Sequence, residues 1–272
     1  MAQGASGTST VTITPQNGFS GSVSLSASGL PSGVTASFSP NPATATSMLT
    51  LVASGTATMG TVAVTITGTS GSLTNTTTIA LTVNFPPGWL DADVGSVGTA
   101  GSASYANGTF TVKASGKWIY DVADGMHFVY QALSGDKTIV ARVVSVQGSA
   151  LPEAGVMIRE TLGTSSIHAY TTWEPYLGPS IYFYSRATTG GTTASQRNAV
   201  NGLPYWVKLV RSGNTFSGYA SADGVNWAQV GSSQTITMSQ NFYVGLAVSA
   251  NDNTALITAA FDNVSITTPT SP

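Results

Sequence analysis

Along most of the chain, apolar residues alternate with Thr, Ser or other small residues at a period of two. The runs Val62–Ile66 (VAVTI) and Ile79–Val83 (IALTV) are examples. Because successive side chains of a strand point to opposite faces of a sheet, this period predicts half-buried strands. Turn-forming segments such as Gly29–Gly33 and Pro40–Pro42 separate the runs. No helical period is present, so the pattern predicts an all-β protein.

The same alternation continues after Trp89. Asn107-Gly108 and Asp223-Gly224 lie between apolar runs and are two-residue hairpin signals. The runs predicted as strands in this part are Thr109–Val112, Phe128–Tyr130, Thr138–Val146, Ala154–Arg159, His168–Trp173, Ile181–Tyr184, Tyr205–Val210, Phe216–Tyr219, Phe242–Val248 and Ile257–Ile266. So many strands in succession predict a large sandwich of two sheets.

The distribution of charge divides the chain in two. Residues 1–90 contain no Asp, Glu, Lys, Arg or His, and every charged side chain lies between Asp91 and Asp262. Between the halves, Asn84–Gly88 contains paired prolines, which favour a stiff, extended connector. We therefore predict one domain over residues 1–85 and a second over residues 86–268. Acid–base chemistry and carboxylate ligands are confined to the second domain.

The N-terminal domain contains two stretches of recognisable sequence, Gly18–Val23 (GFSGSV) and Leu30–Pro40 (LPSGVTASFSP). These stretches resemble the Ig-like domains that bacteria attach to exported enzymes and adhesins. The resemblance implies an Ig-like β-sandwich that serves as a spacer.

Four ordered blocks of the second domain resemble the concanavalin A-like lectin/glucanase domains of bacterial secreted proteins, of the DUF1349 and laminin-G-like type. The blocks are Ala154–Glu160 (AGVMIRE), Pro204–Leu209 (PYWVKL), Ser221–Trp227 (SADGVNW) and Phe261–Val264 (FDNV). The resemblance implies a concanavalin A-like jelly-roll β-sandwich. Related jelly rolls serve as carbohydrate-binding modules, as lectins and occasionally as enzymes, so the fold alone does not fix the activity.

Composition narrows the range of partners. Only 7% of residues are charged against 42% that are hydrophobic, and such surfaces are typical of secreted β proteins. With a net charge of −2 and no Lys/Arg cluster, the chain lacks the basic stripe that nucleic-acid binding needs. No apolar run approaches the roughly 20 residues that span a bilayer. We predict an exported, extracellular bacterial protein that binds no nucleic acid, has no membrane span and belongs with other modules of a larger secreted protein.

Aromatic and planar polar side chains give the second domain the parts of a sugar site. Sugar rings stack on Trp and Tyr, while Asn, Gln, Arg and carboxylates bond to their hydroxyls. Strand alternation places Tyr182, Tyr184 and Arg186 on one face, opposite Ile181 and Phe183. We predict a non-catalytic carbohydrate-binding module for a polysaccharide, with a concave face formed by Trp118, Tyr120, Arg159, Tyr170, Trp173, Glu174, Tyr176, Tyr182, Tyr184 and Arg186.

Within this set the side chains have different expected roles. Trp173, Glu174 and Tyr176 flank Pro175, which predicts a loop. The aromatic rings are expected to stack on sugar, and Arg159, Arg186 and Glu174 to orient hydroxyls or an acidic substituent.

Two other classes of function remain open. Retaining glucanases of this fold carry Glu-x-Asp-x-x-Glu on one strand, which is missing here, since the glutamates are only Glu153, Glu160 and Glu174. The enzymatic alternative is therefore a polysaccharide lyase or an atypical glycoside hydrolase. A lyase needs a cation and a Tyr or His to move the proton, and Arg159, His168, Tyr170 and Tyr184 supply those types. The third class is a cell-surface adhesion or stalk module without affinity for sugar.

No cofactor is required for reversible sugar binding. A structural Ca²⁺ is the one ion that the sequence leaves open, because Asp121 and Asp124 lie three residues apart in a turn-like stretch. Capping and turn hydrogen bonds explain isolated aspartates equally well. Zinc is disfavoured, since the chain has two histidines and no cysteine.

Overall fold

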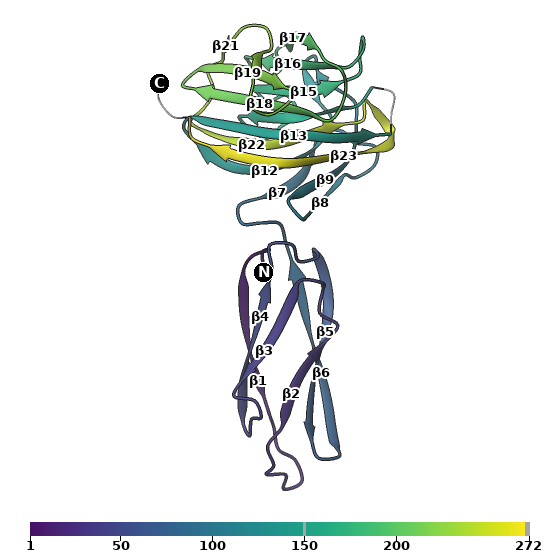
Figure 1. Ribbon diagram of the computed structural model, residues 1–272, viewed down its shortest axis with the longest axis vertical. Helices are drawn as coiled ribbons and strands as arrows, with labels where there is room; N and C mark the ends of the chain where they lie inside the picture. Colours follow the sequence, from purple (N-terminus) through teal and green to yellow (C-terminus); the bar gives the residue numbers. More distant parts are fainter. Residues whose placement is uncertain (149–150, 270–272) are drawn as a thin grey trace. The chain divides into compact units, whose positions relative to one another are not determined.

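The computed structural model describes residues 1–148 and 151–269, and all regular elements within these ranges are β-strands (Figure 1). Nowhere in these ranges is there a helix long and apolar enough to cross a membrane. The strands form two compact units, one from Met1–Pro87 with Tyr105–Asn107 and the other from Gly88–Ser104 with Gly108–Pro272. The prediction of an all-β protein built from sandwiches is confirmed.

The smaller unit is a sandwich of two three-stranded antiparallel sheets. Alternate residues of its strands fill the space between the sheets, with Leu49 and Val64 at most 1% exposed. One sheet has the order β1 (Ser6–Thr12), β4 (Thr46–Ala53), β3 (Val34–Ser39), and the other has the order β2 (Ser24–Ser28), β5 (Gly60–Ser70), β6 (Leu73–Val83).

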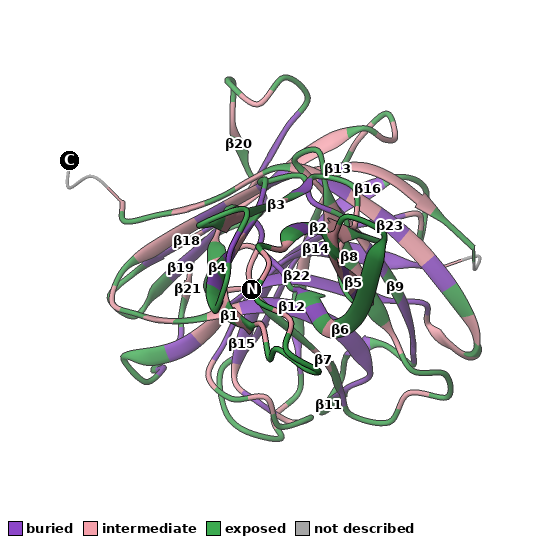
Figure 2. Ribbon diagram, turned by 90° about the horizontal axis from the view of Figure 1, so that it is seen from below, coloured by how far each residue is buried: buried purple, intermediate pink, exposed green. Residues whose placement is uncertain are grey.

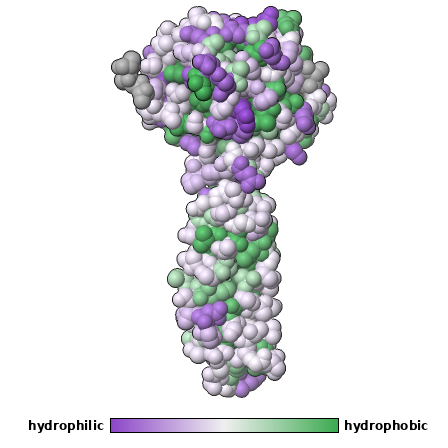
Figure 3. All heavy atoms as spheres, in the orientation of Figure 1, coloured by the Kyte–Doolittle hydropathy of each residue, from purple (hydrophilic) through white to green (hydrophobic). Residues whose placement is uncertain are grey.

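Thr, Ser and Gly dominate the surface of the smaller unit, in keeping with its lack of charged side chains. In Figure 3 the visible face of this unit is mostly pale, which marks residues of intermediate hydropathy, with green hydrophobic patches. Such a surface can pack or space other elements. It offers no titrating group for catalysis.

The larger unit contains the sheet that positions the candidate site. This sheet has seven antiparallel strands, and its central strands β12, β14 and β22 are largely buried (Figure 2). Its order is β17 (Ala194–Ala199), β16 (Ser180–Arg186), β15 (His168–Glu174), β14 (Glu153–Arg159), β22 (Asn241–Ser249), β12 (Met126–Ser134), β7 (Leu90–Val94).

A second sheet packs against one face of the seven-stranded sheet. It has the order β20 (Ala228–Gln229), β19 (Thr215–Ser221), β18 (Tyr205–Ser212), β13 (Lys137–Gln147), β23 (Asp252–Thr267), β9 (Thr109–Gly116), β8 (Ser102–Ala106), and β21 (Gln234–Thr235) also pairs with β19. A separate two-stranded hairpin is formed by β10 (Ile119–Tyr120) and β11 (Ala123–Asp124).

Strand alternation assigns each side chain of the seven-stranded sheet to an inner or an outer face. A Cβ atom at Gly218 of β19 would lie 2.8 Å from the Thr171 Oγ1 atom and 2.9 Å from the Phe183 ring, so these two side chains face the eight-stranded sheet. Their chain neighbours Tyr170 and Tyr184 therefore point to the other, outer face. The outer face is where the predicted aromatic rows lie.

Candidate functional site

The outer face of the seven-stranded sheet brings residues from several strands into register. Tyr170 pairs with both Met157 and Tyr184, and Tyr182 pairs with Thr172. These side chains form one cluster of aromatic and apolar groups with Phe128 and Tyr130 of β12. Loops and the β10–β11 hairpin then divide this face into a closed end and an open end.

The open end is a cavity of about 610 Å³. Rings reach it from four places: the segment that leads into β10, strand β10 itself, the loop after β15, and strand β16. The residues that line it are Lys117, Trp118, Tyr120, Asp121, Val122, Ala123, Leu151, Glu153, Glu174, Tyr176, Tyr182, Tyr184, Ser195 and Asn251. We refer to this space as the aromatic cavity.

Three rings at the mouth of the cavity are exposed, and the position of one of them, Trp118, is set by its backbone. Trp118 is 44% exposed and adopts a φ of 68°, a left-handed conformation that is uncommon for a bulky residue. Its backbone N–H donates to the Asn251 side-chain oxygen at 2.9 Å. Tyr120 is 42% exposed, and Tyr176 is 50% exposed. Bulky rings that remain accessible at a cavity mouth can take a ligand without first leaving a core.

The deeper rings form a stack. Tyr182 and Tyr184 lie with ring centroids 5.4 Å apart, nearly parallel, and Tyr120 meets Tyr184 edge-on at 5.7 Å. The Tyr182 hydroxyl donates to the backbone carbonyl of Tyr176 at 3.0 Å, which fixes the orientation of its ring. Tyr182 and Tyr184 are each only 5% exposed, so they form the wall and floor of the cavity.

Two carboxyl groups lie side by side at this end. Ala154 pairs with Trp173, so the next residues, Glu153 and Glu174, lie opposite each other on β14 and β15. Glu153 accepts hydrogen bonds from the Ile119 backbone N–H at 3.1 Å and from the Asn251 amide at 3.2 Å. Both oxygens of this carboxyl group are therefore engaged in holding the β10–β11 hairpin and the Asn251 turn.

Only one oxygen of the Glu174 carboxyl group is hydrogen-bonded. Its Oε2 atom accepts the Tyr184 hydroxyl at 3.1 Å, while its buried Oε1 atom accepts no hydrogen bond from any described residue. Burial raises the pKa of Glu174 well above its usual range, and the neighbouring charge of Glu153 raises it further. Burial likewise raises the pKa of Glu153 to about 8. Both carboxyl groups are therefore harder to ionise than exposed ones, and a cation placed beside them would favour ionisation.

The closed end of the outer face is a buried cluster of charge around Asp124. The Arg186 guanidinium lies 2.8 Å from one oxygen of this carboxylate and the Arg159 guanidinium 3.3 Å from the other. All three side chains are fully enclosed. Other guanidinium hydrogens bond to backbone carbonyls, including those of Gly163 and Tyr120, and the Arg159 Nη1 group donates to the Met126 and Met157 sulfurs. The cluster thus fastens the β10–β11 hairpin and the loop after β14 onto the sheet.

His168 completes the closed end. Its Nδ1 atom lies 3.7 Å from an oxygen of Asp124, and neither ring nitrogen has a hydrogen-bond partner among the residues described. Burial lowers the pKa of His168 to about 4, with the charges of Arg186 and Arg159 acting in the same direction. Burial also lowers the pKa of Arg159 to about 10, against the opposing attraction of Asp124. His168 is therefore neutral at pH 7.

The structure divides the predicted carbohydrate-binding residues between these two ends. Those that line the aromatic cavity are Trp118, Tyr120, Glu174, Tyr176, Tyr182 and Tyr184. Arg159, Tyr170 and Arg186 lie on the same face but have no exposed surface. The expectation that the two arginines orient sugar hydroxyls is corrected by this burial, because their donors are already bonded to Asp124 and to backbone carbonyls.

Trp173 differs from its neighbour Glu174. Both belong to β15, so the prediction that they lie in a loop is wrong. Alternation turns Trp173 toward the interior of the sandwich, where its Nε1 atom is buried and the residue is 9% exposed. Strand β15 continues to Glu174 and ends just before Pro175, so the predicted loop began two residues too early.

The two aspartates predicted as calcium ligands both contact Arg186, Asp124 through its carboxylate and Asp121 through its backbone carbonyl. Asp124 is paired with two guanidinium groups, as described above. Asp121 lines the aromatic cavity, and its backbone carbonyl accepts the Thr193 N–H at 3.0 Å. Among the described residues no group of three or more His, Cys, Asp or Glu side chains could hold a metal ion. Binding of Ca²⁺ at this position stays a prediction.

Glu153 and Asn251 are among the cavity residues that were not predicted from the sequence. Glu153 shares its strand face with Met157 and Arg159, so the alternation that identified those two could also have found it. Asn251, which joins Trp118 to Glu153 through its side chain, lies in a turn after β22 and gives no pattern of its own. Only the folded chain brings it to the site.

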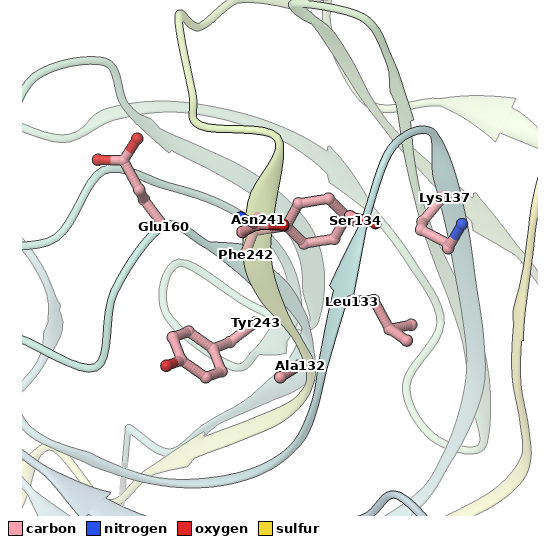
Figure 4. A pocket seen from close by; sticks show the side chains of 8 residues that line it. All are labelled: Ala132, Leu133, Ser134, Lys137, Glu160, Asn241, Phe242 and Tyr243. Atoms are coloured by element: carbon pink, nitrogen blue, oxygen red, sulfur yellow. The ribbon is translucent and has the colours of Figure 1, made fainter.

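A second cavity, of about 500 Å³, lies at the ends of β12 and β22 (Figure 4). Glu160 and Lys137 flank it on opposite sides, and Tyr243 is among its lining residues. None of the residues predicted to bind carbohydrate lines this cavity. The aromatic cavity is therefore the better candidate.

No family model matches the chain, and comparison with curated proteins gives no significant match. Among solved structures, a functionally unknown protein from Saccharomyces cerevisiae is similar with a TM-score of 0.55 and 18% identity, over 67% of this chain and 96% of that one. At this identity the similarity shows the fold alone.

Weaker similarities involve two further structures. The GH43 BlXynB protein from Bacillus licheniformis has a TM-score of 0.46 and 14% identity, over 58% of this chain and 33% of that one. The exoplasmic/lumenal domain of VIP36, in its Ca²⁺/Man3GlcNAc-bound form, has a TM-score of 0.45 and 9% identity, over 68% of this chain and 86% of that one. Any functional argument must therefore come from the site itself.

Proposed function

We propose that the larger unit is a carbohydrate-binding domain and that its ligand lies in the aromatic cavity. The observation that carries this proposal is the convergence of five rings, from Trp118, Tyr120, Tyr176, Tyr182 and Tyr184, on one space that also contains the free Glu174 oxygen. Flat apolar faces and a few fixed polar atoms are the combination that sugar rings require.

The sizes and positions of the groups support this assignment. A cavity of about 610 Å³ falls in the range of sites for small organic ligands. Exposed Trp118 and Tyr176 would stack on sugar rings at the mouth. Inside the cavity, the Glu174 Oε1 atom would accept a hydrogen bond from a sugar hydroxyl. Binding of this kind is reversible and requires no cofactor.

A glycan array probed with the full chain tests the proposal. The parent protein is expected to retain a defined set of glycans, and the Trp118→Ala/Tyr176→Ala double variant is expected to lose them. Because both side chains are at least 44% exposed, their removal should leave the unfolding transition nearly unchanged. A parent protein that ignores every glycan would refute the proposal and favour an adhesion or stalk role.

Hydrolysis is the second candidate, because Glu153 and Glu174 lie opposite each other on adjacent strands. A retaining hydrolase needs one ionised carboxylate free to attack and one acid to protonate the leaving group. Glu153 is only 1% exposed, and both of its oxygens accept hydrogen bonds. This arrangement favours binding over hydrolysis, and a reducing-sugar assay on the glycans that the array identifies would separate the two.

The lyase alternative has weaker support. Arg159, His168 and Tyr170 have no exposed surface, so a polymer chain in the aromatic cavity would meet only Tyr184 of that set.

We further propose that the protein is exported and extracellular, on the basis of its low charge and its Thr- and Ser-rich surface. Repeating the array with a chelator tests the predicted Ca²⁺ at Asp121 and Asp124.

A further inference from the structure

The charges that line the aromatic cavity are mostly acidic. Carboxyl groups come from Asp121, Glu153 and Glu174, and the lining contains a single cationic side chain, that of Lys117. Lys117 belongs to the exposed segment before β10, whereas Glu153 and Glu174 are 1% and 4% exposed at the floor. A ligand that enters the cavity therefore meets carboxyl groups at its deepest point.

Guanidinium groups that could receive an acidic sugar are absent from the lining. Arg159 and Arg186 lie at the closed end of the face and are already paired with Asp124. A carboxylate or sulfate substituent in the cavity would face Glu174 and Glu153 without a compensating cation at the floor. At the floor of the cavity the charge distribution therefore disfavours acidic glycans; Arg197, which pairs with Tyr182 on β17, lies outside the lining and donates to the Ser180 hydroxyl.

The Glu174 carboxyl group is suited to a cation. Its Oε1 atom is buried, faces a space large enough for a ligand, and accepts no hydrogen bond from any residue that the structure describes. An ammonium group placed there would favour the ionised form of Glu174, so this carboxyl group would release its proton to solvent on binding and accept a hydrogen bond from the ammonium group. Glu174 thus lacks a donor that a sugar amine could supply.

The surrounding rings favour the same ligand. The faces of Tyr182 and Tyr184 lie parallel, with Tyr120 edge-on to Tyr184, and Trp118 is at the mouth. Aromatic faces attract cations through the ring quadrupole, and combined aromatic and acidic walls are the usual surroundings of bound ammonium groups. A neutral sugar would use the rings but leave the buried carboxyl group without an ionic partner.

We propose that the aromatic cavity selects a glycan that carries free amino groups, of the glucosamine type, with one ammonium group bound to the Glu174 carboxylate. This inference rests on the proposed function, because it names the class of sugar that the same cavity takes. It concerns the preference among glycans rather than binding itself.

The test compares soluble β-1,4-linked oligomers of equal length built from glucosamine, N-acetylglucosamine or glucose. Binding to the full chain is measured by calorimetry at about pH 6, where a sugar amine is largely protonated. The glucosamine oligomer is expected to bind about 10-fold more tightly or better, since its amine forms a charge-assisted hydrogen bond. Added salt should weaken this preference only modestly, because the contact is buried.

Two variants separate a specific contact from general attraction of a cationic oligomer to an acidic protein. Glu174→Gln is expected to bring the three affinities to within a few-fold of one another. Glu160→Gln removes the same charge outside the aromatic cavity and should keep the full preference.

Each outcome bears on a different claim. Equal binding of all three oligomers by the parent protein would overturn the amine preference and leave carbohydrate binding intact. An equal loss of preference in both variants would overturn it too, because general attraction would then explain the result. Should none of the oligomers bind and the glycan array also stay blank, the proposed function itself fails.

Discussion

The two ends of the outer face share strands, register and alternation, yet differ in what covers them. At one end Arg159, His168 and Arg186 are buried under the β10–β11 hairpin, and Asp124 neutralises part of the charge of the two arginines. At the other, Glu153 and Glu174 lie beneath a cavity walled by tyrosines. Chemically active side chains on an outer sheet face become a site only where the covering segment leaves room.

The comparison also separates the roles of charge. The closed end uses ion pairs to fasten a hairpin, and both of its guanidinium groups are paired with Asp124 without solvent access. The open end keeps a buried carboxyl oxygen without a protein donor, at a cost in folding free energy. Such a cost is understandable where a ligand supplies the missing donor.

Asp124→Ala should produce the largest effect, because it leaves Arg159 and Arg186 buried without their counter-ion. We expect a loss of about 3–5 kcal/mol in the free energy of unfolding, measured by chemical denaturation. Asp262→Ala is the matched control, since its partner Arg142 is 36% exposed and the expected loss is about 0–1 kcal/mol. Losses of similar size in both variants would contradict the fastening role of the closed end.

The closed end should also make the protein sensitive to acid. The pKa of His168 is about 4 in the folded chain and 6.5 without burial, so only the unfolded chain binds a proton between these values. The free energy of unfolding therefore falls as pH decreases from 6.5 to about 4, by an amount on the order of 3 kcal/mol. His168→Gln should flatten this limb of the stability profile, and an unchanged slope would remove His168 from the explanation.

The open end should make the free energy of unfolding depend on pH in the opposite direction. Because burial raises the pKa of Glu153 from 4.5 to about 8, the folded chain retains a proton that the unfolded chain has lost across this range. Its contribution to stability is complete below about pH 4.5 and declines as pH rises toward 8. Glu153→Gln should reduce that decline in thermal unfolding curves recorded between these pH values. An equally steep decline in the variant would assign it to other groups.

Much of the fold could be predicted because period-two patterning is local. Ile181–Tyr184 and Ala154–Arg159 were assigned to strands, and both lie within β16 and β14. The outer position of Tyr182 and Tyr184 follows from the same alternation. The boundary at Trp173 was misplaced, since a proline two residues later was taken to mark the loop itself.

Accessibility could not be predicted, because it depends on segments that are distant in the sequence. Arg159 and Tyr184 have the same alternation on neighbouring parts of the sheet, but the hairpin at residues 119–124 covers one and leaves a cavity over the other. The pairing of Glu153 with Glu174 could not be predicted for the same reason. Glu153 and Glu174 are 21 positions apart and meet only through the pairing of β14 with β15.

The smallest expected effect concerns single rings at the cavity mouth. Trp118→Ala should weaken glycan binding by about 0.5–1.5 kcal/mol, beyond the loss of buried area, and leave stability nearly unchanged. Trp173→Ala should do the reverse, since its ring fills the sandwich interior and its loss should cost about 3–5 kcal/mol in unfolding. Parallel titration and denaturation of both variants checks this. Weakened binding with unaltered unfolding in Trp173→Ala would reverse the assignment of the two faces.

The most direct measurement is a crystal structure of the full chain with a bound glycan oligomer. We predict sugar rings against Trp118 and Tyr176, and a polar group of the ligand within hydrogen-bond distance of the Glu174 Oε1 atom. An oligomer bound instead at the second cavity, beside Tyr243 and Glu160, with the aromatic cavity containing only solvent, would contradict this prediction.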